Sequence, residues 1–198
     1  MVYIATYSMS TKHQHYLLHK PYGYLSQLIN NQNKRKNKKL LGELYNFAIG
    51  TMAIGRLDEN SEGLLLLTTD GKVSEAIRSH QVDKEYYVQV AGLIDITAIE
   101  KLQLGVEISI NGAMYLTKTC VVKPINSLGD YPIAPRHVRD ERHGPTSWLS
   151  ITLNEGKFRQ VRKMTAVVGF PTLRLVRVRI GTIHLNVNVG EVIEMDEF

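Results

Sequence analysis

The chain has 198 residues, 43% of them hydrophobic, so it is long enough to bury a core as one domain or as one domain with two lobes. Its formal net charge of +5 suits a polyanionic partner but is also common among ordinary proteins, so charge alone identifies no function. The single cysteine, Cys120, excludes an internal disulfide framework and a cysteine-rich zinc site, and no signal peptide or apolar run of roughly 18 residues directs the chain to export or to a membrane, which favours the cytoplasm.

The first segments of the chain are polar and loosely patterned. Residues 1–14 show no hydrophobic period and are predicted to form a flexible leader. A short strand over 16–19 then runs into Lys20-Pro21-Tyr22-Gly23, where proline ends regular pairing and glycine permits a turn. The run 34–39 carries five cations in six positions. It is therefore either a solvated charged loop or a contact to RNA.

A carboxylate, Asp58, stands in a polar turn directly before a buried strand. The turn lies between Gly55 and Gly63, and the apolar run 64–67 that follows is typical of a strand covered on both faces. Catalytic groups often lie on such loops at the edge of a rigid element. Aspartate is also an ordinary turn residue, so spacing alone leaves both interpretations open.

The middle of the chain alternates helices and strands. The pattern predicts a helix over 72–80 and a strand over 84–91 that places Tyr86 and Val88 on one face. A second helix over 95–104, capped by Asp95, precedes strands near 106–110 and 115–123. The segment 124–145 is predicted to be a long basic loop, with surface cations that suit phosphate better than metal: Arg136, His137, Arg139, Arg142 and His143.

The last third of the sequence predicts a strand over 149–153 and a helix that ends at Gly169. Arg159, Arg162 and Lys163 project from the first turns of this helix. The final strand changes its alternation near Leu175, which predicts a bulge at residues 175 and 176. The whole order of elements predicts an α+β fold with a largely antiparallel sheet.

Several segments, in this order along the chain, resemble the signature motifs of the pseudouridine synthases of the ribosomal small-subunit synthase A family: 20–23, 55–71, 84–90, 154–164 and 168–181. The resemblance covers most of the chain. Within that family, 145–149 and 162–166 are most similar to the large-subunit synthase E branch. The resemblance implies a mixed sheet in two lobes with a central RNA-binding cleft, and an aspartate loop at the floor of that cleft.

The resemblance also implies roles for individual residues. Asp58 matches the nucleophile and Tyr86 matches the tyrosine that lies against the target base. Arg162 matches an arginine of the third motif, a cation that would favour the ionised form of Asp58. Leu173 matches an apolar residue near the base. The other expected substrate contacts are Arg56, Lys20, Arg159 and Lys163.

The implied reaction is an isomerisation, so it needs no redox cofactor, metal or nucleotide energy source. The expected partner is ribosomal RNA, with the large-subunit 23S rRNA preferred, and the expected state is a monomer in the cytoplasm. Residues 15–198 are expected to form the catalytic domain, without the separate N-terminal RNA-binding domain that many relatives carry.

Two alternatives stay open. The first is a non-catalytic RNA-binding or ribosome-associated protein that uses the same basic surface. The second is a hydrolase of glycosidic bonds, which would need a second carboxylate about 5 to 10 Å from Asp58. Among the carboxylates close to Asp58 in the sequence, Glu62 is the preferred candidate.

Overall fold

The computed structural model describes residues 12–29, 37–79 and 82–198. Most of the predicted leader, and Lys34, Arg35 and Lys36 of the basic run, lie outside these residues. No helix in the described ranges is long and apolar enough to cross a membrane. The elements are β1 (His15–Lys20), β2 (Tyr24–Leu25), β3 (Lys39–Leu40), η1 (Leu41–Glu43), β4 (Met52–Ala53), β5 (Glu62–Thr68), α1 (Gly71–Ser79), β6 (Lys84–Ala91), α2 (Ile96–Leu104), β7 (Glu107–Ile110), β8 (Ala113–Leu116), β9 (Val121–Ile125), η2 (Glu141–His143), β10 (Thr146–Leu153), α3 (Gln160–Val167), β11 (Thr172–Ile180), β12 (Ile183–His184) and β13 (Val192–Met195).

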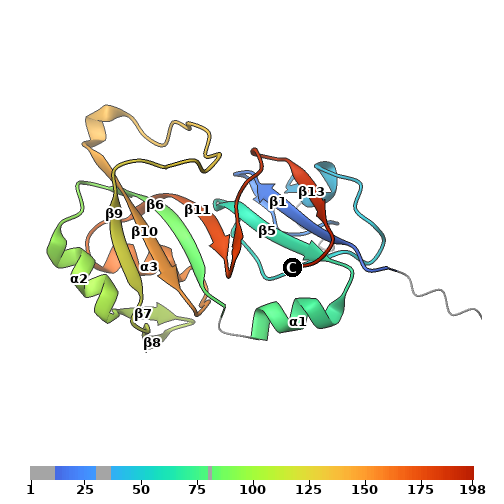
Figure 1. Ribbon diagram of the computed structural model, residues 1–198. Coiled ribbons are helices and arrows are strands. Elements are labelled where there is room, and N and C mark those ends of the chain that lie inside the picture. Colours follow the sequence, from blue (N-terminus) through green and yellow to red (C-terminus); the bar gives the residue numbers. More distant parts are fainter. Residues whose placement is uncertain (1–11, 30–36, 80–81) are drawn as a thin grey trace, which may run out of the picture.

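One mixed sheet runs through the whole molecule, as Figure 1 shows. Its strand order is β13-β1-β5-β11-β6-β10-β9, with β4 on β5 and β12 on β11. Of the strand pairs in this sheet, β5 with β11 is parallel and the others are antiparallel. The predicted α+β fold with a largely antiparallel sheet is therefore confirmed. The parallel pair joins one half, built on β1, β5 and β13, to the other, built on β6, β9 and β10.

The join between the two halves requires a glycine. Gly63 pairs with Arg177 across the parallel β5–β11 contact and has a φ of +101°. A Cβ at this position would lie 2.3 Å from the Arg177 carbonyl oxygen, so no larger residue fits without moving the backbone. The backbone that follows Asp58 is thereby fixed against β11.

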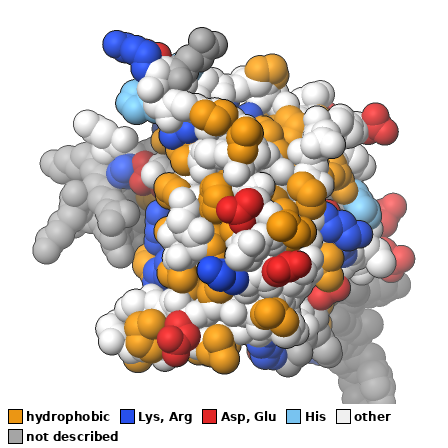
Figure 2. Space-filling view, turned by 90° about the vertical axis from the view of Figure 1, so that its left-hand side faces the viewer, with side chains coloured by type: hydrophobic (Ala, Val, Ile, Leu, Met, Phe, Trp, Pro, Cys, Tyr) orange, Lys and Arg blue, Asp and Glu red, His pale blue; other side chains and the backbone are white. Residues whose placement is uncertain are grey.

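Strand β5 is buried on both faces, as predicted. Leu64 and Leu66 belong to a core shared with β11, whereas Leu65 and Leu67 belong to a second core that packs against β1 and the segment after it. A third core fills the other half, where β6 and β10 pack against α2 and α3. Seen from that half, the surface mixes hydrophobic, acidic and basic side chains, and neither charge dominates it (Figure 2).

The predicted strand over 115–123 is wrong, because β8 and β9 are separate strands. The residues between them bond elsewhere: Thr117 Oγ1 accepts a hydrogen bond from Val106 N, and Cys120 N donates to Gln103 O. These bonds turn the chain from the β7–β8 hairpin into the edge of the main sheet.

The predicted bulge at residues 175 and 176 is also misplaced. The register of β11 against β6 shifts between Thr172 and Arg174, and again between Arg177 and Arg179. Leu175 packs into the core under α3, and Val176 packs into the core under β5. The change in alternation therefore marks the point where the two faces of the strand are covered by different cores.

Candidate active site

Lys20 supports the backbone of the loop that carries Asp58. The Lys20 side chain is fully buried, and its Nζ donates to Ser61 O at 2.7 Å, to Pro21 O at 2.9 Å and to Glu59 O at 3.4 Å. Burial lowers the pKa of Lys20 from 10.5 to about 8. This corrects the prediction that Lys20 contacts RNA, because its ammonium group faces the backbone of the loop.

The backbone on the other side of Asp58 is fixed as well. Ser26 Oγ donates to Leu57 O at 2.8 Å and accepts from Leu57 N at 3.0 Å. Within the loop, Ser61 N donates to Asp58 O at 3.0 Å. The carboxylate therefore stands on a rigid turn while its side chain stays 28% exposed.

Two arginines from the third motif face Asp58. Arg159 Nη1 lies 3.2 Å from Asp58 Oδ2, and Arg162 Nε lies 4.0 Å from the same oxygen. Arg162 Nη2 also donates to Asn60 O at 2.6 Å and to Ser61 Oγ at 3.3 Å. Burial, and secondarily the Arg159 charge, lower the pKa of the Arg162 guanidinium, while Asp58 opposes the shift. Two cations therefore lie beside the carboxylate, where the sequence predicted one.

Arg159 has an unusual backbone. It stands immediately before α3 with φ +53° and ψ +35°. Residues other than glycine rarely adopt this left-handed backbone conformation. Such backbone strain is typical of functional sites, where the surrounding structure imposes it. The turn directs the Arg159 side chain back toward Asp58, at the N-terminal end of the helix.

Asp58 lines two cavities, and a third lies beside them. The smallest of them, about 90 Å³, is lined by Asp58, Tyr86 and Leu175 together with the start of α3. A larger cavity of about 730 Å³ extends along 25–27 and 156–159, and another of about 370 Å³ extends toward α1. Arg56 is exposed and lines all three. This layout admits a base beside Asp58 and a sugar-phosphate chain on either side.

Tyr86 forms the aromatic wall of the site. Its ring packs against the core under α3, and it lines two of the cavities. Within the described residues its hydroxyl has no hydrogen-bond partner, so it is available to a ligand. The predicted position of Tyr86 beside Asp58 agrees with this geometry.

Two predicted contacts lie elsewhere. Leu175 lines the small cavity, and Leu173, two residues earlier, does not. The bulge after Thr172 moves Leu173 out of the register that the sequence suggested. Lys163 Nζ donates to Ser109 O at 2.6 Å, so Lys163 ties α3 to β7 and does not face the cavity.

Sequence reasoning missed a second carboxylate in the site, Glu155. It accepts hydrogen bonds from Tyr115 at 2.6 Å and from Lys118 N at 3.0 Å, and it also bonds Gln160. Burial would raise the pKa of Glu155, but these hydrogen bonds outweigh it and hold the pKa below its usual value. Glu155 thus anchors the loop before α3. Its place in the third motif was the available signal.

Glu62 is not free to act as a second catalytic carboxylate. It is buried with Arg174, whose Nε and Nη2 donate to its two oxygens at 2.9 and 2.7 Å. Arg136 Nη2 lies 3.3 Å from the same carboxylate. Both oxygens of Glu62 face guanidinium groups inside the core, so this carboxylate is not available to a substrate, which argues against the glycosidase alternative.

The basic loop and the basic run are partly neutralised within the protein. Arg142 pairs with Asp140 at 2.7 Å, and Arg139 donates to the carbonyls of Gly144 and Pro145. Lys38 of the basic run pairs with Glu59 at 2.6 Å. In the described ranges of the chain, no group of three or more His, Cys, Asp and Glu side chains is arranged to hold a metal ion.

Comparison with known proteins places this site in a family. Residues 14–167 match the family model described as RNA pseudouridylate synthase. The chain belongs to the RNA pseudouridylate synthase family. Members of this family are isomerases, and the carboxylate, the aromatic wall and the paired arginines described above lie within or beside the matched region.

Curated relatives and solved structures agree with this assignment. Over 172 residues the chain is 40% identical to ribosomal large subunit pseudouridine synthase E of Xanthomonas axonopodis pv. citri, a match that covers 86% of this chain and 87% of the relative. A protein of the same name from Vibrio parahaemolyticus is 40% identical over 171 residues, covering 85% of this chain and 68% of the relative. A crystal structure of a pseudouridylate synthase shares the fold, with a TM-score of 0.72 and 24% identity over 92% of this chain and 70% of that one.

Proposed function

We propose that this protein converts a uridine of ribosomal RNA into pseudouridine with Asp58 as the nucleophile. The observation that carries the proposal is the meeting of Asp58, Tyr86 and the two arginines at one cavity. An ionised carboxylate on a rigid loop, with an aromatic wall beside it, suits a nucleotide that has been turned out of its stack.

The chemistry follows from these groups. The N1–C1′ bond of the uridine breaks, the uracil turns, C5 bonds to C1′, the C5 proton leaves to solvent, and N1 takes up a proton in its place. Asp58 carries the intermediate by adding either to C1′ or to C6. Arg159 and Arg162 place positive charge beside the carboxylate that attacks. Tyr86 packs against the detached base, and its free hydroxyl moves the proton.

The remaining residues hold the substrate and the loop. Arg56, which lines all three cavities, contacts the backbone of the turned-out nucleotide. Leu175 packs against the base, in the role first given to Leu173. Lys20 acts through the backbone of the Asp58 loop, as a positioning residue.

We infer the substrate from the relatives. The relatives from Xanthomonas and Vibrio are named for the large ribosomal subunit, which supports 23S rRNA as the target. From its motifs alone, we propose that the chain belongs to the small-subunit synthase A family within the pseudouridine synthases. We further propose that residues 15–198 act as one catalytic domain, as a monomer in the cytoplasm, and recruit RNA through their own surface.

A tritium-release assay tests the proposal. Ribosomal RNA transcribed with uridine labelled at C5 is mixed with purified protein, and released tritium reports the isomerisation. A binding protein would retain the label, and a glycosidase would release uracil. A pseudouridine map of ribosomal RNA from cells with and without the protein then identifies the uridine. Binding without tritium release from any ribosomal transcript or subunit precursor would refute the enzymatic proposal.

A further inference from the structure

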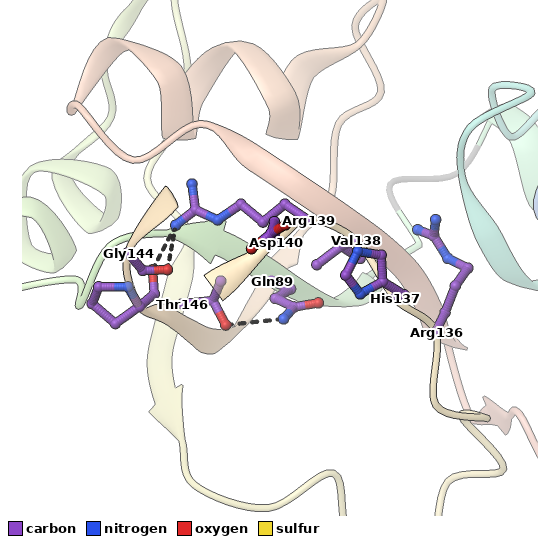
Figure 3. A pocket seen from close by; sticks show the side chains of 9 residues that line it. Gln89, Arg136, His137, Val138, Arg139, Asp140, Gly144 and Thr146 are labelled. Atoms are coloured by element: carbon purple, nitrogen blue, oxygen red, sulfur yellow. Dashed lines mark hydrogen bonds between the residues drawn. The ribbon is translucent and has the colours of Figure 1, made fainter. Parts of the chain in front are cut away.

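A further cavity is separate from the three described around the candidate active site. It encloses about 690 Å³ between the loop 136–145 and the strands β6 and β10, as Figure 3 shows. Its lining shares no residue with the cavity around Asp58. The volume falls within the range of pockets that bind small ligands. The residues that line it are Gln89, Arg136, His137, Val138, Arg139, Asp140, Gly144, Pro145 and Thr146.

Two arginines of this cavity have guanidinium N–H groups that make no hydrogen bond. Nε of Arg136 and Nε of Arg139 are buried and have no hydrogen-bond partner in the described part of the chain, and Arg136 Nη2 faces Glu62 Oε1 at 3.3 Å without a hydrogen bond. Buried N–H groups are nearly always satisfied in native proteins, so unsatisfied guanidinium donors call for a partner. A phosphate group would supply oxygens that guanidinium groups bind well.

The charge balance of the lining also favours an anion. Arg136 and Arg174 share one carboxylate, Glu62, so one positive charge is left uncompensated. The acidic residue of the lining, Asp140, is paired with Arg142, and Arg142 also lowers its pKa. The carboxylate therefore does not neutralise the cavity, and an entering phosphate meets a net positive wall.

The opposite side of the cavity is suited to the edge of a base. Gln89 Nε2 donates to Thr146 Oγ1 at 3.0 Å, which fixes the orientation of the Gln89 amide (Figure 3). Among the described residues the Gln89 amide oxygen has no partner. A side-chain amide offers a donor and an acceptor, the pair of groups that proteins use to bind unstacked bases.

The cavity is next to the candidate active site. The Arg136 guanidinium lies over the Tyr22 ring at 4.2 Å, and Tyr22 belongs to the turn whose Gly23 N donates to Glu59 O in the Asp58 loop. Arg136 and Tyr22 both act on the pKa of Arg162, in opposite directions. A strand of RNA that places one nucleotide at Asp58 can therefore reach this cavity with a neighbouring nucleotide.

We propose that this cavity holds a second nucleotide of the RNA substrate, also turned out of its stack, close to the target uridine. Arg136 and Arg139 bind its phosphate, and Gln89 with Thr146 contacts the edge of its base. The inference rests on the proposed function, because RNA is the substrate. It adds a site that would help to select which uridine is modified.

Ultraviolet cross-linking tests this site without any need for turnover. Short-wavelength light joins bases to side chains in contact with them, and mass spectrometry locates the joined peptides. The protein bound to a ribosomal RNA transcript should give cross-links within 137–146 as well as at the Asp58 loop. In the Gln89→Leu variant, the cross-links within 137–146 should fall about tenfold, as expected for the loss of a base contact.

A matched control separates this effect from a general loss of RNA binding. Thr97→Leu changes an exposed residue of α2, a helix that contributes no residue to the lining of the cavity, and should leave both sets of cross-links unchanged. Cross-links that are absent from 137–146, or that persist undiminished in the Gln89→Leu variant, would overturn the second nucleotide site. Cross-links at both sites without tritium release would instead refute the isomerase proposal.

Discussion

Arg159 and Asp58 are 101 residues apart in the sequence, yet Arg159 Nη1 lies 3.2 Å from Asp58 Oδ2. Arg162 is farther from the same oxygen, at 4.0 Å, and more deeply buried, with 12% of its side chain exposed against 39% for Arg159. The two cations therefore have different tasks. Arg162 supports the loop through Asn60 and Ser61, whereas Arg159 can leave Asp58 and follow an entering phosphate.

This difference predicts distinct effects for two substitutions. Arg162→Met removes the bonds to Asn60 O and Ser61 Oγ, so it should lower the free energy of unfolding by about 1–3 kcal/mol. It should also reduce turnover about 100-fold, because the loop shifts. Arg159→Met should reduce turnover and RNA affinity with less than about 1 kcal/mol of destabilisation. Urea unfolding measures the stability of the two variants, and single-turnover rates measure their catalysis. Equal destabilisation by the two substitutions would contradict the different roles given to Arg162 and Arg159.

The role of Asp58 is tested by Asp58→Asn, which removes the charge and keeps the shape. We expect turnover to fall by about 10⁴-fold or more, because the other carboxylate of the site, Glu155, is held by hydrogen bonds to its neighbours and cannot replace the nucleophile. RNA affinity and thermal stability should change little, since the carboxylate is partly exposed. Tritium release at the wild-type rate would show that Asp58 is not the nucleophile.

The hydroxyl of Tyr86 can be separated from its ring. Tyr86→Phe keeps the wall of the cavity and removes the group proposed to move the proton, so turnover should fall about 10²-fold at unchanged RNA affinity. Tyr86→Leu should lower affinity too, because the stacking surface is lost. If the Phe variant turns over like the wild type, Tyr86 serves through packing alone.

Much of the fold could be predicted because local patterns and tertiary packing agree. The buried run 64–67 and the Asp95 cap of α2 are examples, since apolar continuity and capping chemistry act over a few residues. The break between β8 and β9 could not be predicted. It depends on hydrogen bonds to Val106 and Gln103, which no local pattern reveals.

In the site, too, some residues could be predicted from the sequence and others could not. Motif resemblance indicated Asp58, Tyr86 and Arg162, and the structure brings them together. The resemblance also indicated Leu173, but the register of β11 shifts between Thr172 and Arg174, and Leu175 lines the cavity instead. The burial of Lys20 could not be foreseen either, because a lysine in a turn is ordinarily exposed.

Lys20 makes the stability of the fold depend on pH. Its pKa is about 8 in the folded protein, below its usual value of 10.5, so the unfolded chain binds one more proton between these two pH values. The free energy of unfolding should therefore rise with pH across this window, by about 1–3 kcal/mol in total.

Urea unfolding from pH 7 to 10 checks the sign against Lys20→Met, which lacks the titrating group. The difference between the two proteins should be smallest below pH 8 and should grow as the pH rises from about 8 toward 10.5. The Met variant should also lose turnover, because the carbonyls of Glu59 and Ser61 lose their shared donor. Parallel stability curves would show that Lys20 does not titrate in this range.

The buried pair of Glu62 and Arg174 supports the stability of the join between β5 and β11. Glu62→Gln would leave Arg174 and Arg136 without their shared carboxylate, and an unpaired buried charge costs about 3–5 kcal/mol. The matched control is Glu59→Gln, whose partner Lys38 is 36% exposed, and it should cost less than about 1 kcal/mol. Urea unfolding compares the two. Because Glu62 supports structure and not catalysis, folded Glu62→Gln protein should still release tritium; release of free uracil by the wild type that is lost in this variant would instead support the glycosidase interpretation.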